Sequence, residues 1–295
     1  MQPIPQVASP SLARDLTALA RPRLATLGLL TVVLAYVIAL PPAFSGPVFV
    51  HLVVGSLLAL TGASVMNQVL EVGRDALMRR TAERPLPAGR LASRPAAALG
   101  VVVSALGVIQ LAIGVNVLAA VWACLGLASY LAVYTPLKTH TSLATVVGAV
   151  PGAVPVMMGW AAARGDLDRA AWTLFAILFL WQLPHFLAIA WMYRTDYSRA
   201  GFRMLPVEDP AGGSTARQVV LYAVALLPVS VLPAVLGLAG PVYFVGALAL
   251  GMGYLVAGVA MGRRRTAPAA RRLLRVSVLY LPALLLLLAI DRVLF

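Results

Sequence analysis

Three side chains with metal-ligating oxygen atoms lie four residues apart in the first third of the chain. Asn67, Glu71 and Asp75 have the spacing that places residues on one face of a helix. Mg²⁺ binds through one or two carboxylates and fills its other positions with water and phosphate oxygens. We therefore predict that these three residues are catalytic and hold Mg²⁺ on a diphosphate. The alternative is a set of interfacial charges that pair with nearby arginines.

Basic side chains follow this triplet within a few turns. Arg80 and Arg84 carry guanidinium groups, whose rigid fork of donors suits phosphate oxygens. We expect both to bind the diphosphate. Glu71 and Asn67 lie inside an apolar stretch, where a carboxylate without a role would be costly, so the sequence favours the catalytic interpretation.

A second polar cluster lies in residues 181–210. Asp196 is a candidate catalytic residue and ligand of a second Mg²⁺, and Arg199 and Arg203 are candidates for the same diphosphate. The alternative for Asp196 is a capping role in a loop. Within the apolar part of the cluster, His185 could ligate haem iron, donate a proton or form an orienting hydrogen bond.

A third polar segment contains the only lysine of the chain, Lys138. An ammonium group there could act in catalysis as a point-charge phosphate binder, or it could be a snorkelling interfacial residue. Tyr134, four residues earlier, could stabilise a carbocation through its ring face. Tyrosine is also common in interfacial belts, so both interpretations of Tyr134 stay open.

The composition indicates the elements that must position these residues. Of 295 residues, 61% are hydrophobic and 11% are charged, whereas soluble domains carry about 25% charged residues. The chain is therefore predicted to be an all-α, polytopic membrane protein. Its net charge of +13 fits the arginines that flank membrane spans, and no nucleic-acid partner is expected.

Apolar runs of spanning length predict nine transmembrane helices in one domain, residues 1–295, that begins with a polar segment at 1–20. The predicted spans are 24–40, 48–70, 95–114, 116–135, 143–161, 170–191, 218–236, 241–261 and 273–290.

The basic residues alternate between the predicted loops. With nine spans, 20 of the 23 basic residues fall on one side. The positive-inside rule then predicts a cytoplasmic N-terminus and an outside C-terminus. All the polar clusters described above fall at or near the cytoplasmic ends of helices.

These segments resemble the UbiA superfamily of intramembrane prenyltransferases, and within it the branch that farnesylates protohaem IX. The resemblance rests on NQVLEVGRDALMRRTAERPLPAGR (67–90), YTPLK (134–138), VGAVPGAVPVMMGW (147–160), WQLPHF (181–186) and DYSRAGFRMLPV (196–207). One departure is Thr139, where the branch commonly has arginine, which leaves Lys138 as the basic residue at that point.

The resemblance implies a Mg²⁺-dependent transfer of the farnesyl group of farnesyl diphosphate to a vinyl group of haem b, which gives haem O and diphosphate for terminal oxidases. It implies a multi-pass protein of the bacterial inner membrane, with the lipid bilayer around it and haem A synthase as a candidate partner. The rival interpretations are a quinone-pathway prenyltransferase and, from another class, a membrane transporter. WQLPHF and Glu71 argue against the first, and the clustering of charge at one face argues against the second.

Overall fold

The computed structural model describes residues 11–40 and 43–294 of the chain, and these residues form helices without any strand. Within them, nine helices are long and apolar enough to cross a membrane. The all-α fold with nine spans is therefore confirmed. The spans are Leu12–Ala39, Gly46–Leu70, Ser93–Gly114, Val117–Leu137, Ala144–Arg164, Arg169–Met192, Gly213–Val235, Pro241–Arg264 and Ala267–Arg292.

Several of these spans are interrupted, so the helices are more numerous than the spans. In chain order they are α1 (Leu12–Ala20), α2 (Pro22–Ala39), α3 (Gly46–Leu70), α4 (Val72–Asp75), α5 (Ser93–Gly114), α6 (Val117–Ala128), the π-helical segment η1 (Ser129–Tyr134), α7 (Thr135–Leu137), α8 (Ala144–Val147), α9 (Ala149–Arg164), α10 (Arg169–Met192), α11 (Arg194–Arg199), α12 (Leu205–Glu208), α13 (Gly213–Val235), α14 (Pro241–Arg264) and α15 (Ala267–Leu294).

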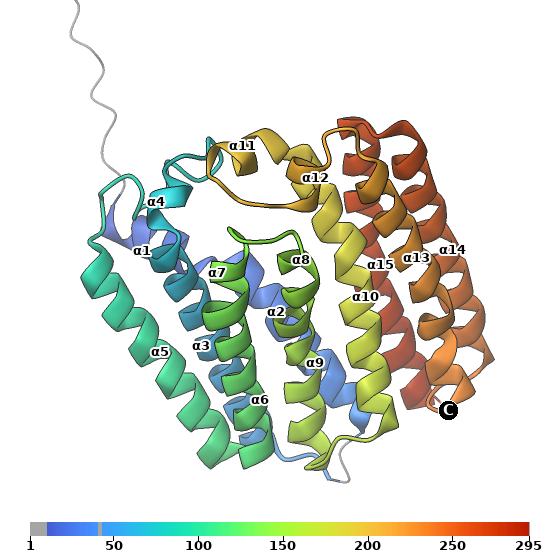
Figure 1. The fold of residues 1–295 in the computed structure, drawn as a ribbon. Helices are drawn as coiled ribbons and strands as arrows, with labels where there is room; N and C mark the ends of the chain where they lie inside the picture. The colour runs from blue at the N-terminus through green and yellow to red at the C-terminus, as the bar shows by residue number, and fades with distance from the viewer. Residues whose placement is uncertain (1–10, 41–42, 295) are drawn as a thin grey trace, which may run out of the picture.

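The long helices run side by side and pack mainly on their neighbours in sequence (Figure 1). α3 packs on α5, α10 on α13, and α13 on α14, while α15 returns to contact both α10 and α2. The spans built on α9 and α10 have the largest buried share, whereas those of α5 and α6 have the smallest. The core therefore lies around α2, α9 and α10.

Glycines allow α3 and α5 to approach closely. A Cβ atom on Gly107 would lie 2.5 Å from the Ala59 backbone nitrogen, and one on Gly62 would lie 2.2 Å from Ser104 Oγ. Small residues of this kind let membrane helices pack backbone to backbone. The contact fixes α3, whose last turn carries Asn67.

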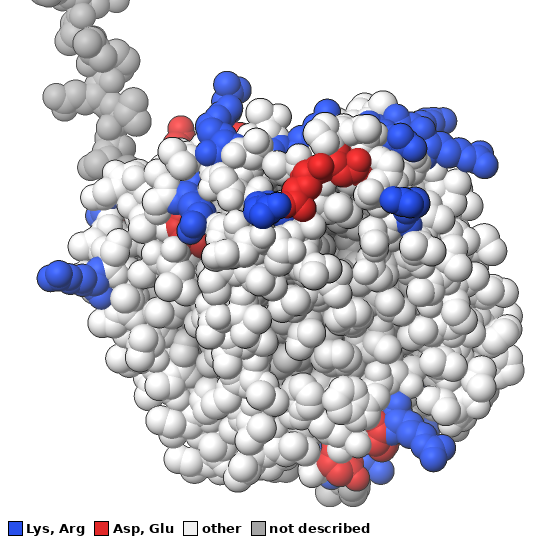
Figure 2. Space-filling model, viewed as in Figure 1, with Lys and Arg blue, Asp and Glu red and all other residues white. Residues whose placement is uncertain are grey.

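The short helices gather at one end of the bundle, which we call the charged end. It carries α1, α4, α7, α11, α12 and the segment 76–92 between α4 and α5 (Figure 1). Basic and acidic side chains gather there, a smaller group of both lies at the opposite end of the bundle, and few appear over the middle of the face in view (Figure 2). The structure thus gathers the charged loops as the sequence predicted.

Two elements differ from the sequence-based expectation. Part of the N-terminal segment expected to be polar is helix α1, in which Asp15 and Leu19 are buried, while residues 1–10 lie outside the described part. The predicted helix 116–135 changes to π-helical geometry at η1. Pro136 has no N–H to donate, and the Thr135 N–H bonds back to the Tyr130 carbonyl, five residues earlier.

Candidate active site

Asn67, Glu71 and Asp75 follow one another across a break in the helix. α3 ends at Leu70, Glu71 has non-helical backbone angles, and α4 then carries Asp75. Backbone bonds from Glu71 N to Asn67 O (3.0 Å) and from Asp75 N to Glu71 O (2.8 Å) keep the four-residue spacing. All three side chains are buried, with exposures of 3%, 8% and 1%.

Asp75 is held by the segment that follows it. Its Oδ2 atom lies 2.6 Å from Arg84 Nη1, and its carbonyl accepts a hydrogen bond from Thr81 Oγ1 at 2.7 Å. Burial lowers the pKa of Arg84, as does the charge of Arg21, and the contact with Asp75 only partly opposes this. The predicted metal ligand, which is buried, and the predicted phosphate binder, which is partly exposed, therefore form an ion pair.

Glu71 and Asn67 are joined to the YTPLK segment. Lys138 forms an ion pair with Glu71 and is only 8% exposed. Asn67 Nδ2 donates to Thr135 Oγ1 at 3.2 Å. The buried position of Lys138 does not fit the snorkelling alternative, and Thr135 is a site residue that the sequence analysis missed. Two segments about 65 residues apart in sequence thus form one polar layer.

Tyr134 lies beside this layer. Its ring centroid is 4.5 Å from Lys138 Nζ and 5.7 Å from the ring of Tyr130, with which it stacks. Gly148 leaves space for the ring, because a Cβ atom there would lie 2.4 Å from Tyr134 Cε2. The π-helical geometry of η1 therefore presents an aromatic face next to the ammonium group.

Arg80 connects the segment 76–92 to α10 and α11. Its guanidinium carbon lies 4.8 Å from the ring centroid of Tyr193 and 5.7 Å from that of Tyr197, and Nη2 donates to Tyr197 Oη at 3.3 Å. The sequence analysis did not single out these two tyrosines. Their four-residue spacing around Asp196 was a signal that they share a helical face.

The remaining residues of the second cluster pair among themselves. Asp196 lies 3.5 Å from Arg199, and Arg203 lies 2.6 Å from Glu208. The Arg203 N–H also donates to the Lys138 carbonyl at 2.8 Å, which joins this cluster to the first. Within the described ranges, no three His, Cys, Asp or Glu side chains converge as a metal site. Asp196 is therefore not grouped with Glu71 and Asp75 in this arrangement.

Asp209, at the same end, has a capping role. Its Oδ2 accepts hydrogen bonds from Thr215 N at 2.8 Å and Thr215 Oγ1 at 3.2 Å. Desolvation raises the pKa of this carboxyl, but the hydrogen bonds from Thr215 and its neighbours outweigh that effect and lower the pKa overall.

His185 lies in a different environment, between α10 and α15. Its Nδ1 atom is 2.7 Å from Ser277 Oγ, and its ring stacks on Trp181 with centroids 5.2 Å apart. Trp181 Nε1 also donates to the Ser277 carbonyl at 2.8 Å. Because Nδ1 is engaged, Nε2 is the ring atom through which His185 could bind a ligand.

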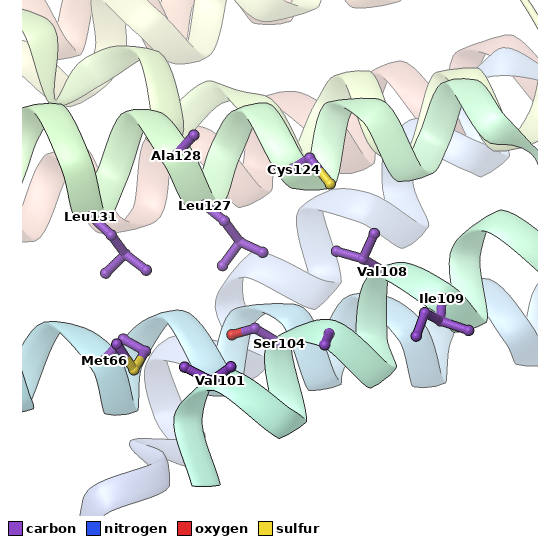
Figure 3. Close-up of a pocket in the computed structure, with 10 residues that line it drawn as sticks. Met66, Val101, Ser104, Val108, Ile109, Cys124, Leu127, Ala128 and Leu131 are labelled. Atoms are coloured by element: carbon purple, nitrogen blue, oxygen red, sulfur yellow. The ribbon is translucent and has the colours of Figure 1, made fainter. Parts of the chain in front are cut away.

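An apolar groove of about 540 Å³ runs between α5 and the α6–η1 helix (Figure 3). Met66 and Leu131 lie at one end of the groove, and Cys124 with Val108 lies toward the other. Met66 directly precedes Asn67, so the groove begins next to the polar layer.

Comparison with known proteins decides the family. A family model described as the UbiA prenyltransferase family matches residues 28–284. The chain belongs to the UbiA prenyltransferase family. It is 48% identical to the protoheme IX farnesyltransferase of Solibacter usitatus, over 95% of this chain and 99% of that one. It is 44% identical to the enzyme of that name from Salinibacter ruber, over 94% and 98%.

Solved UbiA-type structures share the fold. A digeranylgeranylglyceryl phosphate synthase superposes with a TM-score of 0.78 at 14% identity, over 96% of this chain and 99% of that one. A UbiA homolog from Archaeoglobus fulgidus, bound to DMAPP and Mg²⁺, gives 0.72 at 14% identity, over 94% and 99%. The family resemblance predicted from the motifs is therefore confirmed, and the transporter interpretation is set aside.

Proposed function

We propose that this UbiA-family prenyltransferase farnesylates haem b. In the proposed reaction the bond between farnesyl C1 and the diphosphate oxygen breaks, and diphosphate leaves. The terminal carbon of a haem vinyl group forms a new bond to C1. Water adds to the resulting cation and releases a proton, which gives the hydroxyethylfarnesyl group of haem O. The curated relatives that cover nearly the whole chain support this choice of donor and acceptor.

The observation that carries the proposal is the buried polar layer at the charged end. Asn67, Glu71 and Asp75 offer amide and carboxylate oxygens, the donor set that suits Mg²⁺. Lys138 and Arg84 stand within ion-pair distance of the two carboxylates. Bound Mg²⁺ would supply positive charge that stabilises the leaving diphosphate.

The ion pairs suggest how the residues change partners when substrate binds. Glu71 is neutralised by Lys138 and Asp75 by Arg84. If Glu71 and Asp75 held Mg²⁺, Lys138 and Arg84 would lose their partners in a largely buried layer, which would be costly without new anions. A diphosphate provides those anions. We therefore expect Mg²⁺ and the diphosphate to bind cooperatively, each weakly without the other.

The other predicted residues surround this layer in supporting roles. We propose that Arg80, with Arg199 and Arg203, binds the outer phosphate oxygens, and that Asp196 holds a second Mg²⁺ after its pair with Arg199 opens. Tyr134 would face the developing allylic cation, since its ring already lies against the ammonium group of Lys138. Water is kept from that cation by the apolar bundle.

The two apolar substrates need space within the membrane. We propose that the farnesyl chain follows the groove that begins beside Met66 and passes Leu131 toward Cys124 (Figure 3). His185 is the candidate haem ligand through Nε2, with Ser277 fixing the ring through Nδ1. The acceptor would then approach from the α10 side of the bundle.

The chain is a multi-pass integral membrane protein, and we propose that it works as one domain in the bacterial inner membrane. The positive-inside rule supports a cytoplasmic charged end, with the N-terminus on that side and the C-terminus outside. Haem A synthase is the partner we propose, because an apolar haem product passes most readily between enzymes that share the bilayer.

The test uses detergent-solubilised protein with haem b, farnesyl diphosphate and Mg²⁺, followed by chromatography and mass spectrometry of the haem. We expect a mass gain of one farnesyl group and one hydroxyl group in the wild type and none in Asp75→Ala. Prenylation of 4-hydroxybenzoate without a haem product would move the chain to the quinone branch. Folded protein that transfers to neither acceptor would overturn the proposal.

A further inference from the structure

Helix α1 belongs to the charged end (Figure 1) and has no role in the site described so far. It begins with an N-cap in which Ser11 accepts from Arg14 N at 3.4 Å, and it stops at Arg21, whose φ of 50° turns the chain into α2. Leu12 and Leu16 are 66% and 42% exposed. An apolar face of this kind at the end of a membrane bundle suits the lipid interface.

Beside Leu16 on α1 lies a buried carboxylate. Asp15 is 5% exposed, and its two oxygens accept three hydrogen bonds of 3.0 to 3.1 Å from Arg90 Nε and Nη2. The hydrogen bond to Asp15 is the main reason that the pKa of Arg90 is raised. Arg90 Nη2 also donates to the carbonyl of Glu83 at 3.0 Å. That carbonyl directly precedes Arg84, the partner of Asp75.

The last turn of α1 is tied to α3 at the level of the candidate metal ligands. Gln68 Nε2 donates to the Leu19 carbonyl at 2.6 Å, and Gln68 is the neighbour of Asn67. The Leu19 side chain is 1% exposed and packs with Val65 and Leu86. Leu86 belongs to the segment 76–92. α1 therefore contacts both sides of the break that carries Glu71 and Asp75.

We propose that α1 positions the diphosphate-binding segment, and that Asp15, Arg90 and Gln68 are positioning residues for it. Asp15 orients Arg90, Arg90 holds the Glu83 carbonyl, and this places the Arg84 guanidinium against Asp75. Gln68 fixes the end of α3 to the same helix. The inference rests on the proposed function, because the ligand that Arg84 is placed to bind is the Mg²⁺–diphosphate group.

Loss of these positioning contacts should affect substrate binding more than the chemical step. Arg84 contacts the diphosphate before and during the reaction, so its displacement weakens ground state and transition state together, which raises KM more than it lowers kcat. Loss of residues that orient a metal-site ligand typically costs about 10- to 100-fold in affinity. We expect Asp15→Ala to raise the Kd and KM for Mg²⁺–farnesyl diphosphate about tenfold. The KM for haem b should not change.

The experiment measures binding of Mg²⁺–farnesyl diphosphate to the full chain in micelles by titration calorimetry, together with kcat, both KM values and the thermal unfolding midpoint. The matched control is Asp168→Ala, which removes the carboxylate that caps α10 through Ala170 N and Ala171 N. Both variants lose a buried or capping carboxylate, and both should unfold at lower temperature. Only Asp15→Ala should change the Kd for the diphosphate substrate.

Two further variants test the link directly. Asp15 acts through Arg90, so the variant that combines Asp15→Ala with Arg90→Gln should bind no more weakly than Arg90→Gln alone. Arg90→Lys keeps the positive charge and the fold, but an ammonium group cannot bond Asp15 and the Glu83 carbonyl together as the guanidinium group does. It should therefore raise Kd less than Arg90→Gln does.

The outcomes are distinct. Wild-type protein that does not bind Mg²⁺–farnesyl diphosphate would overturn the proposed function and this inference together. If the wild type binds it, and Arg90→Lys and Asp15→Ala both bind it as tightly as the wild type, only the inference is overturned. Additive effects in the double variant would show that Asp15 does not act through Arg90, which also contradicts the inference.

Discussion

The charged end contains buried carboxylates held in opposite-charge pairs, whereas the polar contact between α10 and α15 is a neutral hydrogen bond. Glu71 with Lys138 and Asp75 with Arg84 belong to the first kind. His185 with Ser277 belongs to the second. Ion pairs can be exchanged for a charged ligand, while a neutral pair mainly fixes the orientation of a ring. The comparison supports the proposal that the diphosphate binds in the first region and the acceptor in the second.

The largest effect should come from the charged region. Asp75→Asn removes a metal-binding charge and leaves Arg84 without its anion, so we expect kcat/KM for farnesyl diphosphate to fall by about 100- to 1,000-fold, as when a charge-stabilising group is lost from an active site. Removal of Mg²⁺ by EDTA should abolish turnover of the wild type. Asp209→Asn is the control, because Asp209 caps α13 through Thr215 at the same end. Comparable loss in both variants would contradict the assignment.

The pair between Glu71 and Lys138 should affect stability as well as rate. Lys138→Met leaves Glu71 buried without its cation, which typically costs about 3 to 5 kcal/mol. Combining it with Glu71→Gln should restore much of the unfolding free energy but none of the turnover. Unfolding in micelles and prenyl transfer are measured on the same samples. A Lys138→Met variant as stable as the wild type would show that the pair contributes nothing.

The neutral region should respond differently. His185→Gln removes the candidate haem ligand, and we expect the KM for haem b to rise while the KM for farnesyl diphosphate stays unchanged. Ser277→Ala should have a weaker effect, since one neutral hydrogen bond contributes about 0.5 to 1.5 kcal/mol. The Soret band of bound haem reports any change of ligation. If His185→Gln changed the KM for farnesyl diphosphate instead, the two regions would not have the separate roles proposed here.

The smallest effect concerns the apolar groove. Cys124 is the only cysteine of the chain, it is exposed, and it lies in the groove. Mg²⁺–farnesyl diphosphate should slow its modification by a lipophilic maleimide, whereas Mg²⁺ with inorganic diphosphate should not. Cys124→Ser provides the unlabelled control. Equal labelling with both ligands would place the farnesyl chain elsewhere.

The sequence was sufficient for the membrane fold. Nine apolar runs of spanning length must form helices, because a helix satisfies its own backbone hydrogen bonds within lipid. The placement of the arginines predicts which helix ends share a side of the membrane. The four-residue spacing of Asn67, Glu71 and Asp75 likewise predicted a shared polar face. These features are local, so periodicity and composition carry them.

The partners of those residues were decided by tertiary structure. The packing of distant helices determines three contacts: Lys138 with Glu71, Thr135 with Asn67, and Arg80 with Tyr193. Helix α1 was not predicted for the same reason. The sequence indicated only a polar segment there, because the burial of Asp15 depends on Arg90, 75 residues away. Spacing along a chain determines which side chains share a face, but the pairing of charges requires the packed bundle.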